Sequence, residues 1–485
     1  MIRTAIARRD ITPGESVPLV GYGDRTHDST GVHDPLSVYA WWMQAEGEAP
    51  VAWVVLDLCV LGVDSARELA RAAAARAALP GLLPERLLVS TTHTHSGPNT
   101  LEIDRDERPW ARRYYRLLVE RIAETLADAR ERARPCRIEV RKAAGNLGVN
   151  RRDPRKPVDP RIVLFSLVDA EDRLQGVLFH YSCHLTVLGV DNYLVSADWA
   201  GPVRRSLEGE LGVPVAYLQG AEGNIDPRTR GFLDMADPDQ ARGSSFEVLD
   251  QLASGVASAL REGLDSATVD RLQAVRLRAW EQELPLRYGA LSPQGVRDRI
   301  EEWKRQFAAF LGVPAEQVPE GGNINALVKE RSRSLGLAPD EVRRQVASQF
   351  AYGNFLVTYG SAQAGDRIGD HTGVPAVVQP SRGIVRLPCR LLDFGGVCIL
   401  CAPPEILIEA AFDWQRRQPM RIALVSGMVG GWLGYMPHGE NFEEPEAGER
   451  YETVSTVFAP SACAAMLEAG ERAASTLPSA PCSPR

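Results

Sequence analysis

The sequence has no long apolar run. Nowhere in its 485 residues does a stretch approach the roughly 20 apolar residues that a membrane-spanning helix needs. The first ten residues, from Met1 to Asp10, lack the apolar segment of a secretory signal peptide. We therefore expect no stable insertion into a membrane, and we expect a cytoplasmic location.

An excess of positive charge is also missing. The 55 lysines and arginines are outnumbered by 63 aspartates and glutamates, so the formal net charge is −8. Nucleic acids and anionic membrane surfaces attract basic proteins, so neither is expected as the main partner. A composition of 44% hydrophobic and 24% charged residues is typical of a globular protein, for which we expect a small-molecule partner. The oligomeric state, a homo-oligomer included, stays open.

The eight cysteines do not form a disulfide framework or a complete zinc motif. Cys398 and Cys401 have the Cys-x-x-Cys spacing, but they lie inside an apolar run and no second pair accompanies them. Scattered cysteines in apolar runs are typical of buried thiols in a reducing compartment. We therefore expect these residues in the core.

Two histidines follow an apolar run that predicts a buried strand. Residues 87–92 lead into His93 and His95, and Gly97-Pro98 ends the segment. Side chains two residues apart on a strand share a face, so both imidazoles are expected to point at one place. Imidazole is a common metal ligand and a common general acid or base. The alternative, two satisfied polar residues at a strand end, stays open on this pattern alone.

The order of the predicted elements indicates an α/β fold. Strands at residues 37–43 and 51–60 precede an alanine-rich helix with Asp64 as its predicted N-cap, and the strand that leads to the two histidines follows. This order predicts a βαβ unit with the histidines at the carboxyl edge of a sheet. Strand and helix patterns continue along the chain, so we expect mixed β-sheets flanked by helices.

We interpret residues 1–478 as a single catalytic domain and residues 479–485 as a tail. Between about residues 292 and 350 the sequence changes to charge-rich helical patterns that proline and glycine interrupt. We expect this part to be a helical insertion near the mouth of the pocket.

Polar residues of the type that binds metals stand at other predicted strand ends. His184 and Glu405 each follow an apolar run, and Tyr435 lies in a glycine-rich loop. Two or three histidine and glutamate ligands with one open position are typical of catalytic zinc. Each residue also has an ordinary explanation: a core histidine, a carboxylate at a helix start, a packed aromatic ring. Spacing alone does not bring these distant residues together.

Taken in order, these segments resemble the neutral/alkaline (non-lysosomal) ceramidase family. The Thr-His-Thr-His-Ser-Gly-Pro segment at residues 92–98 is similar to the family signature. Further similar segments follow in the family's order: residues 183–187 and 194–198 (second histidine segment), 219–227 (Gly-Asp-Val-Ser-Pro segment), 404–405 (Gly-Glu), and 434–435 with 451–452 (closing tyrosine-rich stretch).

The resemblance implies a zinc amidohydrolase. In this interpretation His93, His184, Glu405 and Tyr435 hold the metal, and His95 works beside it in proton transfer. We assign four further residues to substrate binding, namely Gly21, Tyr22, Asp34 and Tyr451.

Two positions depart from the family pattern. Asp226 stands where the family has its active-site serine, and Asn224 stands where it has an aspartate; we assign both to the catalytic part of the site. A carboxylate in place of a hydroxyl puts ceramide in doubt and suggests a smaller or more polar acyl amide, including one with a positive charge. We also expect the chain to lack the family's secretory signal and its carboxy-terminal immunoglobulin-like domain.

The sequence thus predicts a zinc-dependent hydrolase that uses metal-activated water to cleave the carbon–nitrogen bond of a soluble or amphipathic acyl amide. An ester or lactone hydrolase is one alternative, because such a site attacks any activated carbonyl. A relative that keeps the metal without catalysis is the other.

Overall fold

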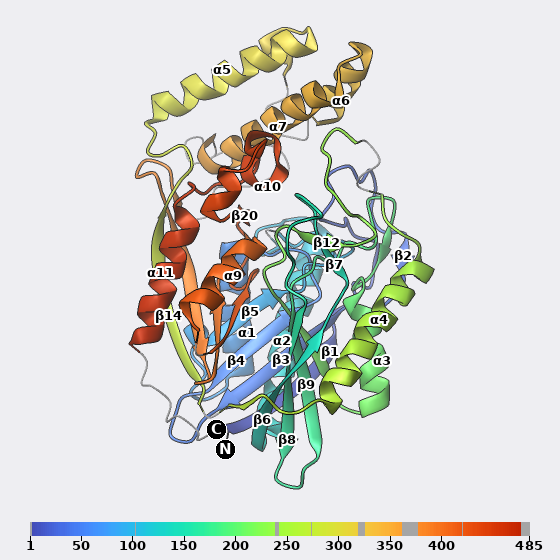
Figure 1. Ribbon diagram of the computed structural model, residues 1–485, viewed down its shortest axis with the longest axis vertical. Helices are drawn as coiled ribbons and strands as arrows, with labels where there is room; N and C mark the ends of the chain where they lie inside the picture. Colours follow the sequence, from blue (N-terminus) through green and yellow to red (C-terminus); the bar gives the residue numbers. More distant parts are fainter. Residues whose placement is uncertain are drawn as a thin grey trace.

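Most strands of the protein belong to two β-sheets (Figure 1). The computed structural model describes residues 2–101, 103–237, 242–272, 274–318, 325–360, 377–419 and 421–476. In these ranges the first sheet has the order β11-β9-β8-β6-β1-β3-β4-β5, with β13 beside β6. Its strands are β1 (Ile2–Asp10), β3 (Ser37–Gln44), β4 (Val51–Leu56), β5 (Leu87–Thr91), β6 (Arg134–Ala144), β8 (Arg161–Asp169), β9 (Leu174–Tyr181), β11 (Val215–Gln219) and β13 (Asp270–Arg271).

The second sheet has the order β14-β16-β17-β19, with β15 beside β16. Three short strand pairs carry loops of the candidate site: β2 with β10, β7 with β12, and β18 with β20. The bounds of these strands are β14 (Arg276–Pro285), β15 (Val378–Gln379), β16 (Ile384–Asp393), β17 (Val397–Cys401), β19 (Ile422–Ser426), β2 (Gly31–Val32), β10 (Leu194–Val195), β7 (Gly148–Asn150), β12 (Ile225–Pro227), β18 (Glu405–Ile406) and β20 (Tyr435–Met436).

Helices flank the sheets, which confirms the predicted fold class of mixed sheets with helices. None of the helices in the described ranges is long and apolar enough to cross a membrane. The helices are α1 (Val63–Ala77), α2 (Pro109–Arg132), α3 (Ala200–Leu211), α4 (Phe246–Asp265), α5 (Pro293–Leu311), α6 (Asn325–Ser334), α7 (Pro339–Phe355), α9 (Ile408–Arg417), α10 (Tyr451–Val454) and α11 (Ala462–Ser475). Single turns are η1 (Pro84–Arg86), η2 (Ala315–Gln317), η3 (Leu356–Gly360), η4 (Gly439–Phe442) and η5 (Ala447–Glu449).

Alternate side chains of strand β3 enter different cores. Ala40 and Trp42 pack with α1 and α2, whereas Tyr39, Trp41 and Met43 pack with residues of the second sheet. This alternation is the period of two that an extended strand imposes. Because both faces are buried, the strand is apolar along nearly its whole length, and the two sheets share one core.

The βαβ unit predicted at the first histidine pair is present. Strand β4 pairs in parallel with β5, and α1 connects them. The predicted N-cap is wrong: Gly62 precedes α1, and Asp64 lies in its first turn. A Cβ atom at position 62 would lie 2.5 Å from the carbonyl oxygen of Leu101, so the close approach of these two backbones favours glycine at the cap.

The segment predicted as a helical insertion contains α5, α6 and α7, which lie together at the top of the view in Figure 1. These helices share a small core of their own that includes Phe307, Val346 and Tyr352. Phe350 of α7 contacts Tyr451 of α10 with ring centroids 4.9 Å apart. Residues 319–324, and the tail predicted at residues 479–485, lie outside the described residues.

A histidine joins the two sheets. The Nε2 atom of His180, on β9, donates a hydrogen bond of 2.9 Å to the carbonyl oxygen of Val425, on β19. Burial lowers the pKa of His180 to about 4 from its ordinary value of 6.5. His180 therefore stays neutral in the folded protein near neutral pH.

The pH dependence of stability should report this burial. Between pH 6.5 and about pH 4 the unfolded chain binds a proton that folded His180 does not, so the free energy of unfolding falls as the pH drops, by up to about 1.4 kcal/mol per unit. Urea unfolding measures the free energy of unfolding of wild type and of His180→Gln. Between pH 7 and pH 5 the wild-type value should fall by about 2 kcal/mol more than the value of His180→Gln. His33→Gln, on the surface, should keep the wild-type slope, and an equal slope in His180→Gln would contradict the assignment.

A buried ion pair ends strand β4 earlier than the predicted range of 51–60. Asp57 accepts hydrogen bonds from the guanidinium of Arg204, on α3, at 2.8 and 2.6 Å. The Asp57 carboxylate also accepts from the backbone of Ser37 at 2.8 Å and from the hydroxyl of Thr92 at 3.3 Å. One carboxylate therefore ties α3, β3 and the residue before His93 together.

Removing this carboxylate should destabilise the whole fold. Asp57→Ala leaves the Arg204 guanidinium buried without the carboxylate that faces it, so we expect the free energy of unfolding to fall by about 3–5 kcal/mol. Asp64→Ala is the control, because Asp64 pairs with the exposed arginines Arg67 and Arg105, and less than about 1 kcal/mol is expected there. Urea unfolding of both variants measures the difference. Equal losses of unfolding free energy in the two variants would show that the buried ion pair contributes no more to stability than the exposed ones.

Candidate metal centre

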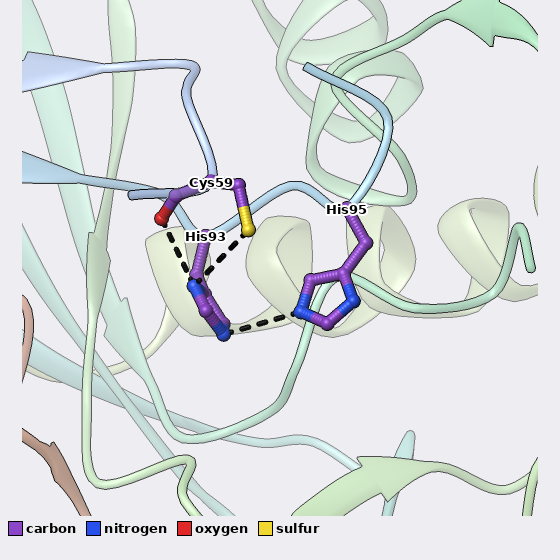
Figure 2. Close-up of side chains that lie close together, drawn as sticks. All are labelled: Cys59, His93 and His95. Atoms are coloured by element: carbon purple, nitrogen blue, oxygen red, sulfur yellow. Dashed lines mark hydrogen bonds between the residues drawn. The ribbon is translucent and has the colours of Figure 1, made fainter. Parts of the chain in front are cut away.

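The two histidines of the first pair converge, but not by the predicted strand geometry. Strand β5 ends at Thr91, and His93 has the left-handed backbone angle φ of 67°. The backbone N–H of His93 donates to the carbonyl oxygen of Leu58, and that of His95 donates to Leu185. Figure 2 shows the result: the two Nε2 atoms face each other at 3.2 Å. The prediction of a shared target was right, and its reason, alternation along a strand, was wrong.

Backbone carbonyl groups orient the imidazoles of His93 and His184. Nδ1 of His93 lies 2.9 Å from the carbonyl oxygen of Cys59, and Nδ1 of His184 lies 2.8 Å from that of Glu222. A carbonyl oxygen only accepts, so each Nδ1 carries a proton and each Nε2 is the nitrogen that faces the cluster. These two Nε2 atoms lie 3.4 and 3.2 Å from the same carboxylate oxygen of Glu405.

Glu405 is held by its strand pairing and by an indole group. Strands β18 and β20 are parallel, and their register places Glu405 opposite Tyr435. The second carboxylate oxygen of Glu405 accepts a hydrogen bond of 2.7 Å from Nε1 of Trp432. Burial alone would raise the pKa of Glu405, but the imidazoles of His93 and His184 lower it well below its ordinary value. Glu405 is therefore a buried, ionised carboxylate.

The donor atoms of His93, His184 and Glu405 fit a transition metal. All three side chains are buried, and their ligand atoms lie within 4.8 Å of one another. With metal–ligand bonds of about 2.0–2.2 Å, two tetrahedral ligands lie about 3.3–3.6 Å apart. The distances of 3.2 and 3.4 Å in this cluster match that spacing. Cys59, His93 and His95 form a second group of the same type, so His95 also stands within reach of a metal ion.

His95 lies on the more open side of the cluster. Burial lowers its pKa well below the ordinary value, and His93 and His184 lower it further, so His95 is neutral at pH 7. The edge of the Tyr22 ring lies against the imidazole, with centroids 4.9 Å apart. Gly21, which is exposed and has φ of 108°, passes so close that a Cβ atom there would lie 2.5 Å from the ring. Gly21 and Tyr22, predicted to bind substrate, are thus beside His95.

Three other predicted site residues lie at different distances from this cluster. Tyr451 packs edge-on against Tyr435, with ring centroids 5.4 Å apart. Asn224 accepts from the backbone of Ile408 at 2.9 Å and donates to Glu409 at 3.0 Å, so it braces the start of α9. Asp34 accepts hydrogen bonds from Ser196, the backbone of Ala197 and Arg205. The structure therefore places Asp34 at the junction of β10 and α3 rather than in the cluster.

Asp226 is brought to the site, where it meets arginines. Its carboxylate lies 3.2 Å from Arg151 and 3.9 Å from Arg230, and it lies 3.6 Å from Nδ1 of His184. Burial would raise the pKa of Asp226, but Arg151 and His184 lower it below its ordinary value. Because the protein itself matches this charge, the geometry does not support the expected positive charge on the substrate.

Sequence reasoning missed Arg151, Arg230 and Trp432. Arg151 lies at the end of β7, and its Cζ atom is 5.5 Å from the centre of the Tyr435 ring. Arg230 contacts Tyr22 and Asp226. Trp432 stands in the same glycine-rich loop as Tyr435, and its indole N–H, a hydrogen-bond donor beside a candidate ligand, is the signal in the sequence that could have indicated it. No local sequence pattern marks the two arginines. Their shared partner, Asp226, is distant from Arg151 in the sequence, and its pairing with Arg230 was not expected.

Comparison with known proteins finds similar sequences and structures. Residues 4–231 match the family described as neutral/alkaline non-lysosomal ceramidase, N-terminal. The amino-terminal part of the chain, just under half of it, is therefore similar to this family. The family predicted from the ordered segments is therefore confirmed.

The ceramidase relatives cover different parts of the chain. Neutral ceramidase of Pseudomonas aeruginosa is 25% identical over 249 residues, which are 46% of this chain and 37% of that protein. Neutral ceramidase A of Dictyostelium discoideum is 20% identical over 511 aligned residues, covering 93% of this chain and 69% of that protein. The match covers 37% of the length of the Pseudomonas protein and 30% of the length of rice neutral ceramidase, which is well under two thirds in both cases.

Solved ceramidase structures share the fold. The crystal structure of neutral ceramidase from Pseudomonas aeruginosa aligns with 97% of this chain and 73% of its own, with a TM-score of 0.64 and 18% identity. A ceramidase solved in complex with C2 aligns with a TM-score of 0.66. The likeness includes the second sheet and the carboxy-terminal loops, beyond the residues that the family match covers.

The geometry of this cluster predicts which variants should bind less metal. Separate changes of His93, His184 and Glu405 to Ala should each lower metal occupancy at least about tenfold, because each removes a buried donor. Plasma emission spectrometry of purified, dialysed protein measures the occupancy. His33→Ala is the control, since this exposed imidazole stacks on Phe246 away from the cluster. Full occupancy in all three cluster variants would contradict the site.

Proposed function

We propose that the protein is a zinc-dependent hydrolase that cleaves the carbon–nitrogen bond of an acyl amide. The observation that carries this proposal is the convergence of three buried donors, His93, His184 and Glu405, beside the neutral imidazole of His95. The relatives named neutral ceramidase support an amide bond as the target.

Zinc would be held by His93, His184 and Glu405, since two imidazoles and one carboxylate form a common catalytic donor set for this metal. When bound, zinc supplies Lewis acidity, which polarises a carbonyl group and lowers the pKa of water. Tyr435 lies opposite Glu405 and is the fourth candidate ligand. Burial raises the pKa of Tyr435 well above its ordinary value, so in the protein alone the phenol keeps its proton.

His95 would transfer the proton. A neutral imidazole can accept a proton from the attacking water and then deliver it to the departing amine. Its Nδ1 atom has no hydrogen-bond partner among the described residues, while its Nε2 faces His93. The backbone of Gly21 and the ring of Tyr22 confine the imidazole, so its orientation is set before a substrate arrives.

Arg151 would stabilise negative charge. Its guanidinium is buried, interacts with Tyr435 and lies beside the cluster. Donors fixed in a site that excludes water stabilise the charge that develops on a carbonyl oxygen during attack. The Asp226 carboxylate would hold Arg151 in place and keep the net charge of this part of the site low.

The substrate that we propose is an acyl amide smaller or more polar than ceramide. Asp226 replaces the family serine and is occupied by Arg151 and Arg230, so this position offers no hydroxyl to a substrate. The same donor set would also attack an ester or a lactone, which is the second candidate activity. A protein that retains the metal but lacks turnover would correspond to the inactive relative.

A substrate panel with one variant tests the proposal. Purified protein should hydrolyse at least one member of a panel of N-acyl amides of increasing acyl length, including short-chain ceramide, faster than the matched esters and lactones. His95→Ala should keep most of the metal and lose at least about a hundredfold in kcat, the usual scale of general acid–base catalysis. Release of the amine or alcohol is followed by mass spectrometry, with metal content measured on the same samples.

The outcomes separate the alternatives. His33→Ala, the exposed control, should retain wild-type turnover. Parallel loss of metal and activity in His95→Ala would make His95 a ligand. Faster turnover of esters would favour the second activity, and a fully metallated protein without turnover would contradict the proposal.

A further inference from the structure

Two adjacent arginines share one buried carboxylate on a distant helix. Nε of Arg151 donates to one oxygen of Glu452 at 2.7 Å, and Nη1 of Arg152 donates to the other oxygen at 2.7 Å. The arginines follow strand β7, whereas Glu452 lies on α10, about three hundred positions later in the sequence. All three side chains are more than nine-tenths buried. Glu452 has none of the roles described above for residues of the site.

The remaining donors of Arg151 point to the candidate centre. Nη1 of Arg151 lies 3.2 Å from Asp226, and Nη2 donates to the carbonyl oxygen of Gly223 at 2.8 Å. The guanidinium also interacts with the Tyr435 side chain. The planar guanidinium is thus fixed on one edge by Glu452 and on the other by groups of the site. A carboxylate that takes the Nε edge determines how far the fork reaches toward Tyr435.

Arg152 has a second anchor that Arg151 does not share. The Glu444 carboxylate accepts hydrogen bonds from Nε and Nη2 of Arg152 at 3.1 and 2.9 Å. The backbone carbonyl oxygen of Asn441 accepts from Nη2 at 3.2 Å. Within the described ranges, the charged partners of Glu444 are Arg152 and Lys156, not Arg151. Glu444 is therefore a matched control: it is a carboxylate in the same ion-pair network, with its charge directed at the neighbouring arginine.

Packing on both sides holds α10 in place. Tyr451, the residue before Glu452, lies edge-on to the Tyr435 ring at 5.4 Å and to the Phe350 ring at 4.9 Å, centroid to centroid. Phe350 belongs to α7 of the helical segment. The position of the Glu452 carboxylate is therefore set by contacts with the site on one side and with the helical segment on the other.

We propose that Glu452 is a positioning residue, which holds the Arg151 guanidinium against Tyr435 and Asp226. The inference rests on the proposed function for its effect on turnover, and it adds a residue of α10 to the machinery of the site. Without the Glu452 carboxylate, the Nε edge of Arg151 loses a charge-assisted hydrogen bond and the fork can turn away from Tyr435. The loss should then affect kcat more than KM, because charge develops on the substrate only in the transition state.

A double-mutant cycle tests the proposal by activity. Glu452→Gln should lower kcat at least about tenfold with KM within about twofold of wild type, and Glu444→Gln should stay within about threefold in both. Arg151→Lys should be impaired, and the double variant Arg151→Lys with Glu452→Gln should be no more than about twofold worse, because both changes disrupt one contact. If Glu452→Gln does not fold, Glu452→Asp, which keeps the charge but shortens the side chain, takes its place in the same cycle.

A second measurement does not depend on turnover. In protein labelled with ¹⁵N at arginine Nε, the signal that disappears in Arg151→Lys belongs to Arg151, and its exchange with solvent should be slow in wild type and in Glu444→Gln. In Glu452→Gln, or in Glu452→Asp if the Gln variant does not fold, that exchange should accelerate at least about tenfold. If the Glu452 carboxylate served only to stabilise the fold, its removal would lower thermal stability without this selective acceleration of exchange at Arg151.

The results separate this inference from the proposed function. If wild type turns over the panel while Glu452→Gln and Glu444→Gln behave alike, or if the effects of Glu452→Gln and Arg151→Lys add fully, the positioning role is wrong and the hydrolase stands. If wild type turns over none of the panel, the proposed function fails, and the Arg151 exchange rates alone decide whether Glu452 holds the guanidinium.

Discussion

The structure depends on the burial of a charged carboxylate between two imidazoles. Glu405 keeps its charge because His93 and His184 present nitrogen atoms to the same oxygen, while Trp432 donates to the other oxygen. Each imidazole is in turn oriented by a backbone carbonyl group, so the loops at the ends of β4, β5, β9 and β11 must lie within a few ångströms of one another. A cluster of lone pairs in a dry interior is stable only with a cation, which is why this arrangement points to a metal.

A second set of buried charges surrounds the first. Arg151 lies between Asp226 and Glu452, and Arg204 faces Asp57, which also accepts a hydrogen bond from Thr92. Such pairs contribute little net stability when compared with apolar packing, but breaking one leaves an unpaired charge. The consequence of these ion pairs is geometric, because they hold segments together that are not joined by β-strand pairing. Asp226 belongs to this set, since its carboxylate is matched by arginines of the same protein.

The likeness of the sequence to the ceramidase family and the extent of the fold come from different observations. The family match covers residues 4–231, whereas Glu405, Tyr435 and Glu452 lie outside it. The solved ceramidase structures align over nearly the whole chain, which places the second sheet and the carboxy-terminal loops in the same fold. The helices α5–α7 pack through Phe350 and Tyr451 onto Tyr435, so contacts of the helical segment extend to the edge of the site.

The sequence by itself determined the elements and the resemblance to the ceramidase family. Periodicity and breaker residues located the βαβ unit around α1 and the strands that precede His93, His184 and Glu405, because these signals are local. Only the tertiary structure decided how the side chains meet. His93 adopts a left-handed conformation that no strand pattern contains, and Asp226 takes Arg151 as its partner, 75 positions earlier in the sequence. Such pairs depend on how the sheets pack, and the packing of distant segments leaves no periodic signal in the sequence.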